Sequence, residues 1–312
     1  MIIVKNSDLC ADPQTRLDLV LADSRHVGVI HCCYLGSELT DIISINDLYA
    51  MDKESFIQYV EYSYHSTPTH HNYSISSRCK ALSKNACVYG KKKLTTIGIG
   101  TSRHCNLYCP MCFQKDKKDL SIEEDKKLYL HLLNLLKGNK QYGIRLTGYG
   151  EPFFYKKEVF EFLKSLTLED ATHVEAISNI TLLNDDDIEE LRKIRNKIPF
   201  YLSVSCSAIT AETYEKVHSK NYFDKVVHNI KQLYNYGILT GINFVVQEEN
   251  LHELEFYQDF WKSNGLSPDR VTLDVNIKAQ SYNKILNSVE YQNYRNSHSI
   301  YVNDTKNGKV TV

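Results

Sequence analysis

Apolar and polar positions along the chain follow two periods, one typical of strands and the other of helices. Residues 94–100 form a β-branched apolar run, which predicts a buried strand. Residues 121–136 begin with a capping-box sequence and place leucines at helical spacing, which predicts an amphipathic helix. Strand-like and helix-like patterns then alternate along the chain as far as residue 276. We expect further strands at 143–147, 172–177, 200–206, 241–247 and 270–276, and further helices at 156–166, 186–194, 224–236 and 250–263.

This alternation predicts an α/β fold in which six strands are joined by helical crossovers and run parallel. The same pattern suits a closed eight-unit barrel or an open doubly wound sheet, and periodicity does not choose between them. In both architectures ligands bind at the C-terminal ends of the strands. Polar residues that directly follow a predicted strand are therefore the first candidates for a functional site.

Two regions flank this core. Residues 1–93 contain a hairpin pattern, a helix and a polar loop, which predict a small α+β module. Residues 281–312 form a polar C-terminal extension, and residues 94–280 make up the core between the two. In the N-terminal module we expect a hairpin of 17–21 and 27–33, a helix at 53–60 and a loop at 63–77, and in the extension strands at 299–302 and 309–312.

Charge and hydropathy narrow the possible partners. The 312 residues carry a net charge of -1, so no overall basic field attracts nucleic acid or an anionic membrane. The sequence has no stretch of eighteen apolar residues, and the segment that begins at Met1 lacks the apolar core and cleavage site of a signal peptide. We therefore expect a cytoplasmic protein without a membrane or nucleic-acid partner.

The nine cysteines indicate metal chemistry, because a cytoplasmic protein keeps its thiols reduced and disulfides are not expected. Three of them, Cys105, Cys109 and Cys112, follow the strand at 94–100 with the spacing Cys-x-x-x-Cys-x-x-Cys. Three thiolates so close share one inorganic centre. A zinc ion would need a fourth ligand, such as His104 or a distant cysteine. An iron–sulfur cubane held by three cysteines would instead leave one iron open to a small molecule.

The cysteine loop resembles the signature of the radical S-adenosylmethionine (SAM) enzymes, and the resemblance extends over residues 94–280. It implies a partial (β/α)6 barrel of the TIM type and a [4Fe-4S] cluster on Cys105, Cys109 and Cys112. The open iron of that cluster would bind the amino and carboxylate groups of SAM. The implied chemistry is reductive cleavage of SAM to a 5′-deoxyadenosyl radical, which abstracts hydrogen from a substrate. A low-potential donor such as flavodoxin or ferredoxin would reduce the cluster.

A second motif follows the strand at 143–147. Gly148, Gly150, Glu151 and Pro152 resemble the Gly-Gly-Glu-Pro segment of the family, which implies that the glutamate meets the ammonium of SAM. Tyr149 stands between the glycines and leaves open which of them lies against the methionine part. A glycine turn with a solvated glutamate is the alternative without function.

The family resemblance implies further SAM contacts for polar residues at the ends of the other predicted strands. Ser178 and Asn179 resemble the start of a Thr-Asn-Gly stretch and would donate to the SAM carboxylate, or else cap the next turn. Ser205 would contact ribose or carboxylate, and Gln247 would contact adenine. Relatives carry an arginine near His218, and here His218 or Lys220 would replace it without offering its planar fork.

Cys206 allows two interpretations. At the end of the strand 200–206 its thiol would return a hydrogen atom to a substrate radical, or it would simply be packed in the core. The other five cysteines precede the core. They resemble the auxiliary-cluster modules called SPASM or twitch domains and would hold a second cluster, with buried free thiols or a zinc site as alternatives. These residues are Cys10, Cys32, Cys33, Cys79 and Cys87, and the four ligands would be Cys10, one of Cys32 and Cys33, Cys79 and Cys87.

The family resemblance implies an enzyme, and relatives with auxiliary clusters often modify ribosomally made peptides. We therefore expect a peptide or protein substrate, with radical oxidation or epimerisation of a small molecule as the alternative. A non-catalytic iron–sulfur or zinc-binding module is the rival from another class. It predicts that no 5′-deoxyadenosine forms from SAM and dithionite.

Overall fold

The computed structural model describes residues 16–30, 41–66, 93–100, 102–112, 120–146, 150–267, 270–277, 284–285, 287–297 and 303–304. The five N-terminal cysteines, Gly148 and the strands predicted at 299–302 and 309–312 lie outside these ranges.

One sheet runs through the molecule. Its strands are β1 Arg16–Leu21, β2 His26–Ile30, β3 Asp41–Ser44, β4 Thr96–Gly100, β5 Gly143–Leu146, β6 Val174–Ser178, β7 Phe200–Ser205, β8 Leu239–Val246, β9 Thr272–Ile277 and β10 Asn303–Asp304. They are ordered β10-β9-β8-β7-β6-β5-β4-β1-β2-β3. The core strands β4 to β9 are parallel, as the sequence predicts. β1 and β10 extend the parallel part at its two ends, and β2 and β3 add an antiparallel edge.

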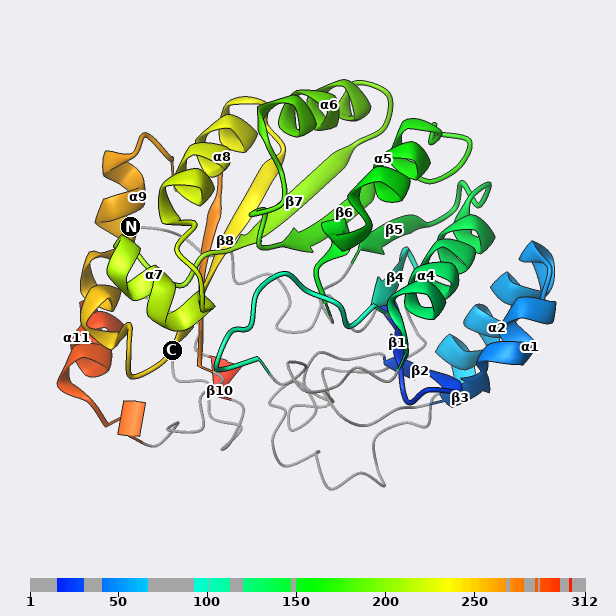
Figure 1. Ribbon diagram of the computed structural model, residues 1–312, viewed down its shortest axis with the longest axis horizontal. Coiled ribbons are helices and arrows are strands. Elements are labelled where there is room, and N and C mark those ends of the chain that lie inside the picture. Colours follow the sequence, from blue (N-terminus) through cyan, green and yellow to red (C-terminus); the bar gives the residue numbers. More distant parts are fainter. Residues whose placement is uncertain are drawn as a thin grey trace.

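Helices cover one face of this sheet. Figure 1 shows α4, α5, α6 and α8 in an arc along the outside of the curved sheet. No described helix combines the length and apolar content needed to cross a lipid bilayer. The helices are α1 Ile45–Ala50, α2 Lys53–Ser66, α4 Ile122–Leu136, α5 Lys156–Lys164, α6 Asp185–Arg195, α7 Ala211–His218, α8 Phe223–Asn235, α9 Tyr257–Ser263 and α11 Val289–Ser297, and the 3-10 helices are η3 Pro152–Tyr155 and η4 Leu251–Phe256.

The main core lies between these helices and the sheet. On α8, Val226, Ile230 and Leu233 recur at helical spacing and are fully buried. On β7, Leu202 and Val204 are fully buried as well, two residues apart as one face of a strand requires. This apolar layer determines which side of each strand faces the helices. The side chains on the other side of the strands are therefore not part of this core.

The opposite side of the sheet, called here the inner face, is polar. Ser203 and Ser205 alternate with the core residues of β7 and are partly exposed. A parallel strand covered on both faces is apolar throughout, so the alternation fits a sheet that the described helices cover on one face. Cross-strand polar pairs line this face: Asn243 donates to Ser203 Oγ at 2.9 Å, and Arg145 pairs with Asp18 at 3.2 Å and with Glu175 at 4.0 Å.

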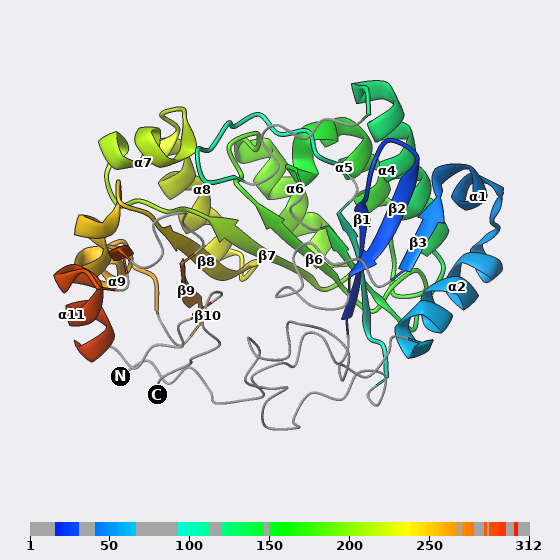
Figure 2. The same cartoon turned by 90° about the horizontal axis from the view of Figure 1, so that it is seen from below.

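The N-terminal hairpin is continuous with the core sheet. β1 pairs in parallel with β4, and Asp18 lies opposite Gly98. A Cβ atom on Gly98 would lie 1.8 Å from Asp18 Oδ1, so a larger residue there would force the Asp18 side chain to move. Figure 2 shows β1, β2 and β3 in succession at one end of the sheet, with α1 and α2 next to β3. These helices pack beside α4, where Lys53 donates to the carbonyl oxygen of Lys137 at 2.7 Å.

Sequence patterns missed several short elements, among them the strand β3 and the helices α1, α7 and α11. Thr210 is the N-cap of α7, where its hydroxyl accepts a hydrogen bond from Thr213 N, and the helix buries Tyr214. α11 buries Tyr291 and Tyr294 on one side. Tyrosine rings supply an apolar surface that a simple division into polar and apolar residues conceals. The predicted loop at 63–77 also starts too early, because α2 continues to Ser66.

The helix predicted at 250–263 is two helices, η4 and α9. Glu253 on η4 is buried and accepts hydrogen bonds from Ile209 N at 2.7 Å and from the Thr210 hydroxyl. This inward-facing carboxylate ties the first turns to the start of α7. Tertiary contacts therefore favour the tighter 3-10 turns over a continuous α-helix.

Candidate functional site

The three-cysteine loop lies at the C-terminal end of β4. It turns between its last two cysteines, where Cys112 N donates to Cys109 O at 3.0 Å. Burial, and next the neighbouring thiols of Cys105 and Cys112, raise the pKa of Cys109 to about 12. The three thiols are therefore close enough to disfavour one another's charge. A cation bound among them would reverse that effect and stabilise the thiolates.

The donor set suits a cubane better than a closed zinc site. Within the described residues, no group of three or more His, Cys, Asp or Glu side chains surrounds a single metal-ion position. A cubane makes a different demand, because each thiolate binds its own iron. His104, the candidate fourth zinc ligand, stacks on Phe154 and directs Nε2 to Leu120 O at 3.3 Å.

Glu151 is a buried carboxylate held at the end of β5. Its Oε1 accepts hydrogen bonds from Ser178 Oγ at 2.6 Å and Phe153 N at 3.1 Å, and its Oε2 accepts one from Asn179 N at 2.9 Å. Burial raises the pKa of Glu151, and these three hydrogen bonds counteract the rise. A carboxylate has about four acceptor positions, so Oε2 retains capacity for one further donor such as an ammonium.

The backbone at Gly150 leaves no room for a side chain. A Cβ atom there would lie 2.4 Å from His104 O and 2.8 Å from Ser102 O. The next amide, Glu151 N, donates to His104 O at 2.9 Å. Pro152 then starts η3, with Glu151 as its N-cap. Gly150 therefore serves close packing between the segments that carry Glu151 and the cysteine loop.

Asn179 connects the carboxylate to the cysteine loop. Its backbone N donates to Glu151, while its Nδ2 lies 3.6 Å from Cys105 Sγ and 3.3 Å from Asn106 Oδ1. Its Oδ1 accepts from Thr181 N at 3.0 Å and from Thr181 Oγ1 at 2.6 Å. The strand end of β6 therefore fixes both the predicted ammonium acceptor and the first cysteine of the loop.

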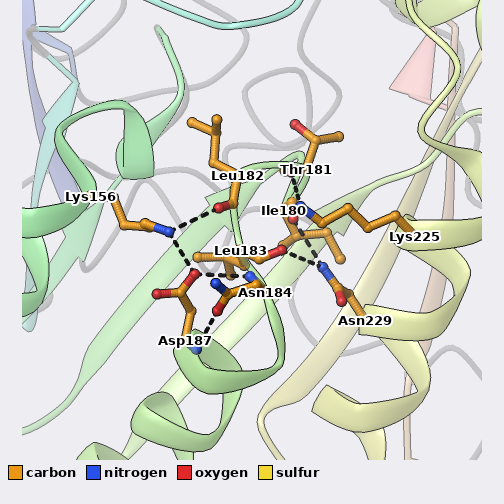
Figure 3. Close-up of polar contacts among 9 residues, drawn as sticks. All are labelled: Lys156, Ile180, Thr181, Leu182, Leu183, Asn184, Asp187, Lys225 and Asn229. Atoms are coloured by element: carbon orange, nitrogen blue, oxygen red, sulfur yellow. Dashed lines mark hydrogen bonds and ion pairs between the residues drawn. The ribbon is translucent and has the colours of Figure 1, made fainter.

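Side chains of α8 hold the backbone of the segment that follows β6. Ile180 has a φ of 51°, a left-handed conformation in which a β-branched residue is strained, and it stands where relatives carry glycine. Asn229 of α8 donates to the carbonyl oxygens of Ile180 at 3.2 Å and Leu183 at 3.1 Å. Figure 3 shows these bonds beside that of Lys225 Nζ to Thr181 O at 2.7 Å.

The same segment is tied to α5 and α6. Lys156 Nζ lies 3.4 Å from Leu182 O and 2.8 Å from Asp187 Oδ2 (Figure 3). Asn184 and Asp187 form a capping box that starts α6. Three helices thus hold one short segment, and surroundings that over-determine a backbone in this way allow strain to persist in it.

His218, the last residue of α7, lies against the cysteine loop. Its Nδ1 is 3.5 Å from Cys109 Sγ, and its Nε2 accepts a hydrogen bond from Ser207 N at 3.1 Å. Burial lowers the pKa of His218 to about 4. Both ring nitrogens therefore have partners within the protein, and His218 lies directly beside the second cysteine of the loop.

The two residues after His218 hold the loop backbone. Ser219 Oγ accepts a hydrogen bond from Tyr108 N at 2.8 Å, and Lys220 Nζ donates to Asn106 O at 2.8 Å. Ser219 adopts a left-handed φ of 69° where α7 ends, which brings its hydroxyl to the loop. The end of α7 therefore contacts the loop at successive points on one side, while Asn179 contacts it on the other.

The other predicted site residues are placed as follows. Ser205 is partly exposed at the end of β7, and Gln247 follows β8 with its backbone N bonded to Asn250 Oδ1 at 2.7 Å. Cys206 is fully buried and directs its thiol to Ala208 O at 3.6 Å. It continues the register of Val204, so it packs on the helix side of the sheet.

Several buried polar side-chain atoms lack a hydrogen-bond partner among the described residues. Two of them are Tyr214 OH on α7 and Gln247 Nε2, which follows β8. Burial, and next the thiols of Cys206 and Cys109, raise the pKa of Tyr214, which therefore lies within electrostatic reach of the cysteine loop. Unpaired buried donors are costly, so both atoms fit a site that a ligand completes. The thiols, Glu151 and these donors together fit a cluster with SAM.

Comparison with known proteins identifies the class. Residues 99–260 match the family model of the Radical SAM superfamily, which is more than half of the chain. The chain therefore belongs to the radical SAM superfamily. This match confirms the resemblance drawn from the cysteine loop, and the family implies an enzyme that binds a [4Fe-4S] cluster and SAM.

The curated relatives are more distant. GTP 3′,8-cyclase of Aliarcobacter butzleri is 24% identical over 64% of this chain and 61% of its own length. An uncharacterised protein of Methanocaldococcus jannaschii is 29% identical over 43% of this chain and 41% of its own length. A probable GTP 3′,8-cyclase of Saccharolobus islandicus is 26% identical over 52% of this chain and 51% of its own length. The chain thus matches less than two thirds of each relative.

Solved structures give weaker likenesses. SuiB of Streptococcus suis bound to S-adenosylmethionine has a TM-score of 0.41 and 14% identity, covering 64% of this chain and 44% of that chain. Native anSMEcpe with bound AdoMet has a TM-score of 0.39 and 16% identity, covering 56% of this chain and 49% of that chain. Likenesses of this size carry no information on the substrate of this chain.

Sequence patterns missed several residues of the site. Thr181, Tyr214 and Ser219 contact the cysteine loop or lie close to it, yet none belongs to a recognisable motif. A signal was present for α7, because Thr210 is a good N-cap residue and starts a helix that ends at the polar run 218–220. Recognising that helix would have brought this run into the site.

Proposed function

We propose that this chain holds its [4Fe-4S] cluster on Cys105, Cys109 and Cys112 and binds SAM beside it. The proposal depends on one observation above all: Asn179 bonds to the buried Glu151 carboxylate through its backbone and to Cys105 Sγ through its side chain. A single residue, Asn179, thus contacts both the acceptor proposed for the SAM ammonium and a cysteine proposed as an iron ligand. When bound, the cluster supplies the electron that breaks SAM into methionine and a 5′-deoxyadenosyl radical, which takes a hydrogen atom from the substrate.

Each residue of the site has a proposed task. Glu151 accepts the ammonium of SAM, and Ser178 keeps that carboxylate oriented. Gly150 allows the segment of Glu151 to approach the cysteine loop. Ser205 and Gln247 are proposed for the ribose and the adenine. A flavodoxin or ferredoxin is proposed as the electron donor.

For the substrate we propose a peptide or protein bound against the inner face. Arg145 is already paired with the carboxylates of Asp18 and Glu175, so acidic groups outnumber basic ones in this cluster. A neutral or cationic chain suits that charge better than a polyphosphate does. The proposed second cluster on Cys10, Cys32, Cys33, Cys79 and Cys87, outside the described residues, is of a kind that often accompanies peptide modification in the family.

A nucleotide is the second candidate substrate. It is favoured by the curated relatives named GTP 3′,8-cyclase, although the chain covers 61% of the first of them. Cyclisation of a nucleotide would be a lyase or isomerase type of reaction, in contrast to the oxidation or epimerisation of a residue. The two candidates predict different responses to added substrate.

The test uses the full chain, reconstituted anaerobically with iron and sulfide and given SAM and dithionite. We expect 5′-deoxyadenosine by chromatography, and none from a variant in which Cys105, Cys109 and Cys112 are alanine. Its absence from the reconstituted wild type would favour a non-catalytic iron–sulfur or zinc module. An increase on adding peptides encoded beside the gene supports peptide modification, whereas an increase with GTP alone supports the nucleotide.

A further inference from the structure

The proton of the His218 imidazole is assigned by its surroundings. Ser207 N donates to Nε2 at 3.1 Å, and a backbone N–H is able to meet only an unprotonated ring nitrogen. The proton of the neutral ring is therefore on Nδ1. That nitrogen lies 3.5 Å from Cys109 Sγ, so the imidazole donates its N–H to this sulfur.

The imidazole is fixed in this orientation by rigid elements. It is 2% exposed, and its ring lies 4.4 Å from the ring of Tyr214 between centroids. Ser207 is itself anchored, because its Oγ accepts from Val245 N at 3.0 Å and its O accepts from Asn250 Nδ2 at 2.8 Å. A side chain so constrained keeps its donor in place when the sulfur binds iron.

The sulfur is fixed as well. Tyr108, the residue before Cys109, donates its backbone N–H to Ser219 Oγ, and the carbonyl of Asn106 accepts from Lys220 Nζ. Both bonds come from the residues that directly follow His218. The segment 218–220 therefore sets the position of the second cysteine relative to the imidazole.

We propose that His218 is a positioning residue of the cluster, whose Nδ1–H bond to Cys109 raises the reduction potential of the cluster. The inference rests on the proposed cluster site at Cys105, Cys109 and Cys112. A hydrogen bond draws negative charge from a ligating thiolate and so stabilises the reduced, more negative cluster. His218 thereby acts on the electron that the cluster accepts.

The test compares midpoint potentials of the reconstituted full chain, measured by redox titration with electron paramagnetic resonance and without SAM. H218F removes the donor and retains an aromatic ring, and H218Q restores a neutral N–H donor. S219A is the matched control, because it removes a bond to the loop backbone without touching a sulfur or changing a charge. Iron content is measured for every variant.

We expect H218F to lower the midpoint by about 59 mV, which is a tenfold change for a one-electron couple. H218Q should recover at least half of that shift, and S219A, which loosens the loop but keeps the donor to the sulfur, should shift the midpoint by less than half as much as H218F. Equal midpoints for H218F and wild type at equal iron content would overturn the inference. So would an equal shift in S219A, because loop loosening would then account for it.

A measurement on the wild type covers the case in which H218F loses its cluster. Pulsed electron paramagnetic resonance of protein labelled with 15N-histidine should reveal a nitrogen coupled to the reduced cluster, and H218Q should abolish it. No coupling in a reduced, iron-loaded wild type contradicts the inference alone. A wild type that assembles no reducible cluster contradicts the proposed function on which the inference rests.

Discussion

Ser178 Oγ donates a 2.6 Å hydrogen bond to Glu151 Oε1, and this bond joins the C-terminal ends of β5 and β6. The serine hydroxyl is thereby committed to the glutamate. Ser178 was predicted to donate to the SAM carboxylate, and its observed bond supports a different task, the orientation of Glu151. Removing the hydroxyl by Ser178→Ala should therefore change how well Glu151 accepts an ammonium.

Glu151 leads to a prediction about pH. Burial raises its pKa above the value of about 4.3 of a free glutamate, so the neutral acid persists to higher pH. In the role proposed for Glu151, the carboxylate accepts the SAM ammonium only when it is ionised. Affinity for SAM should therefore rise as the pH increases through the raised pKa, and fall below it.

Glu151→Gln should weaken SAM binding about tenfold or more at neutral pH, since a hydrogen bond to a charged group contributes about 1.5–3 kcal/mol. It should also abolish the pH dependence. Anaerobic equilibrium dialysis with labelled SAM between acid and neutral pH measures both effects. A wild-type affinity that falls with increasing pH would contradict this role for Glu151.

Gly150 should not tolerate a side chain. The added Cβ of Gly150→Ala would meet backbone atoms, the nearest being His104 O at 2.4 Å, so we expect a loss of about 1–3 kcal/mol in the free energy of unfolding. Iron retention should fall too, because the clash displaces the start of the cysteine loop. Urea unfolding and iron content measure the two effects.

Gly265→Ala is the matched control for this prediction. Gly265 has a φ of +87° and nothing within 4 Å of an added Cβ, so the change introduces backbone strain without a clash. It should cost about 1–2 kcal/mol and leave iron content unchanged. Equal iron content in both alanine variants would show that Gly150 is not needed to position the loop.

Asn229 should be essential for the segment after β6. Asn229→Leu would leave the buried carbonyl of Leu183 without its donor, at about 1–3 kcal/mol for the unsatisfied group, and would remove one of two donors to the carbonyl of Ile180, which keeps Leu183 N at 3.2 Å. The strained φ of Ile180 would also lose its support. Gln232→Ala, at an exposed position of the same helix, should stay within about 0.5 kcal/mol of wild type.

The readout that separates Asn229 from ordinary core residues is SAM binding, since Asn179 on the same segment bonds to Glu151. Thermal unfolding and SAM affinity should both decline in Asn229→Leu. Normal SAM affinity in a folded but destabilised variant would limit its role to stability.

Cys206 allows a test of the hydrogen-donor hypothesis. It is fully buried with its thiol bonded to Ala208 O, which favours packing over transfer to a substrate radical. Cys206→Ala should lower the free energy of unfolding by about 1–2 kcal/mol and leave 5′-deoxyadenosine formation unchanged. A loss of solvent deuterium from the product in this variant would instead support the donor role.

The sequence determined the chemistry of the loop and the order of the core elements. Cysteine spacing is a local property of the chain, and the radical SAM family match confirms what it implied. The strands β4 to β9 and the capping box at Ser121 were readable because hydrophobic period and capping act over a few neighbouring residues. The alternation of Ser203 and Ser205 was visible too, but its meaning was not, since it depends on which face the helices leave uncovered.

Only the tertiary structure decided which polar residues meet. Asn179 lies 74 residues from Cys105 and His218 lies 109 residues from Cys109, and the sequence contains no local trace of either contact. The family pattern suggested SAM contacts for both side chains, and the fold adds contacts with the cysteine loop that the pattern did not indicate. The physical reason is that parallel strands and their crossover helices bring distant segments to one edge of the sheet. Which hydrogen bonds then form there depends on packing in three dimensions, and sequence periodicity does not encode it.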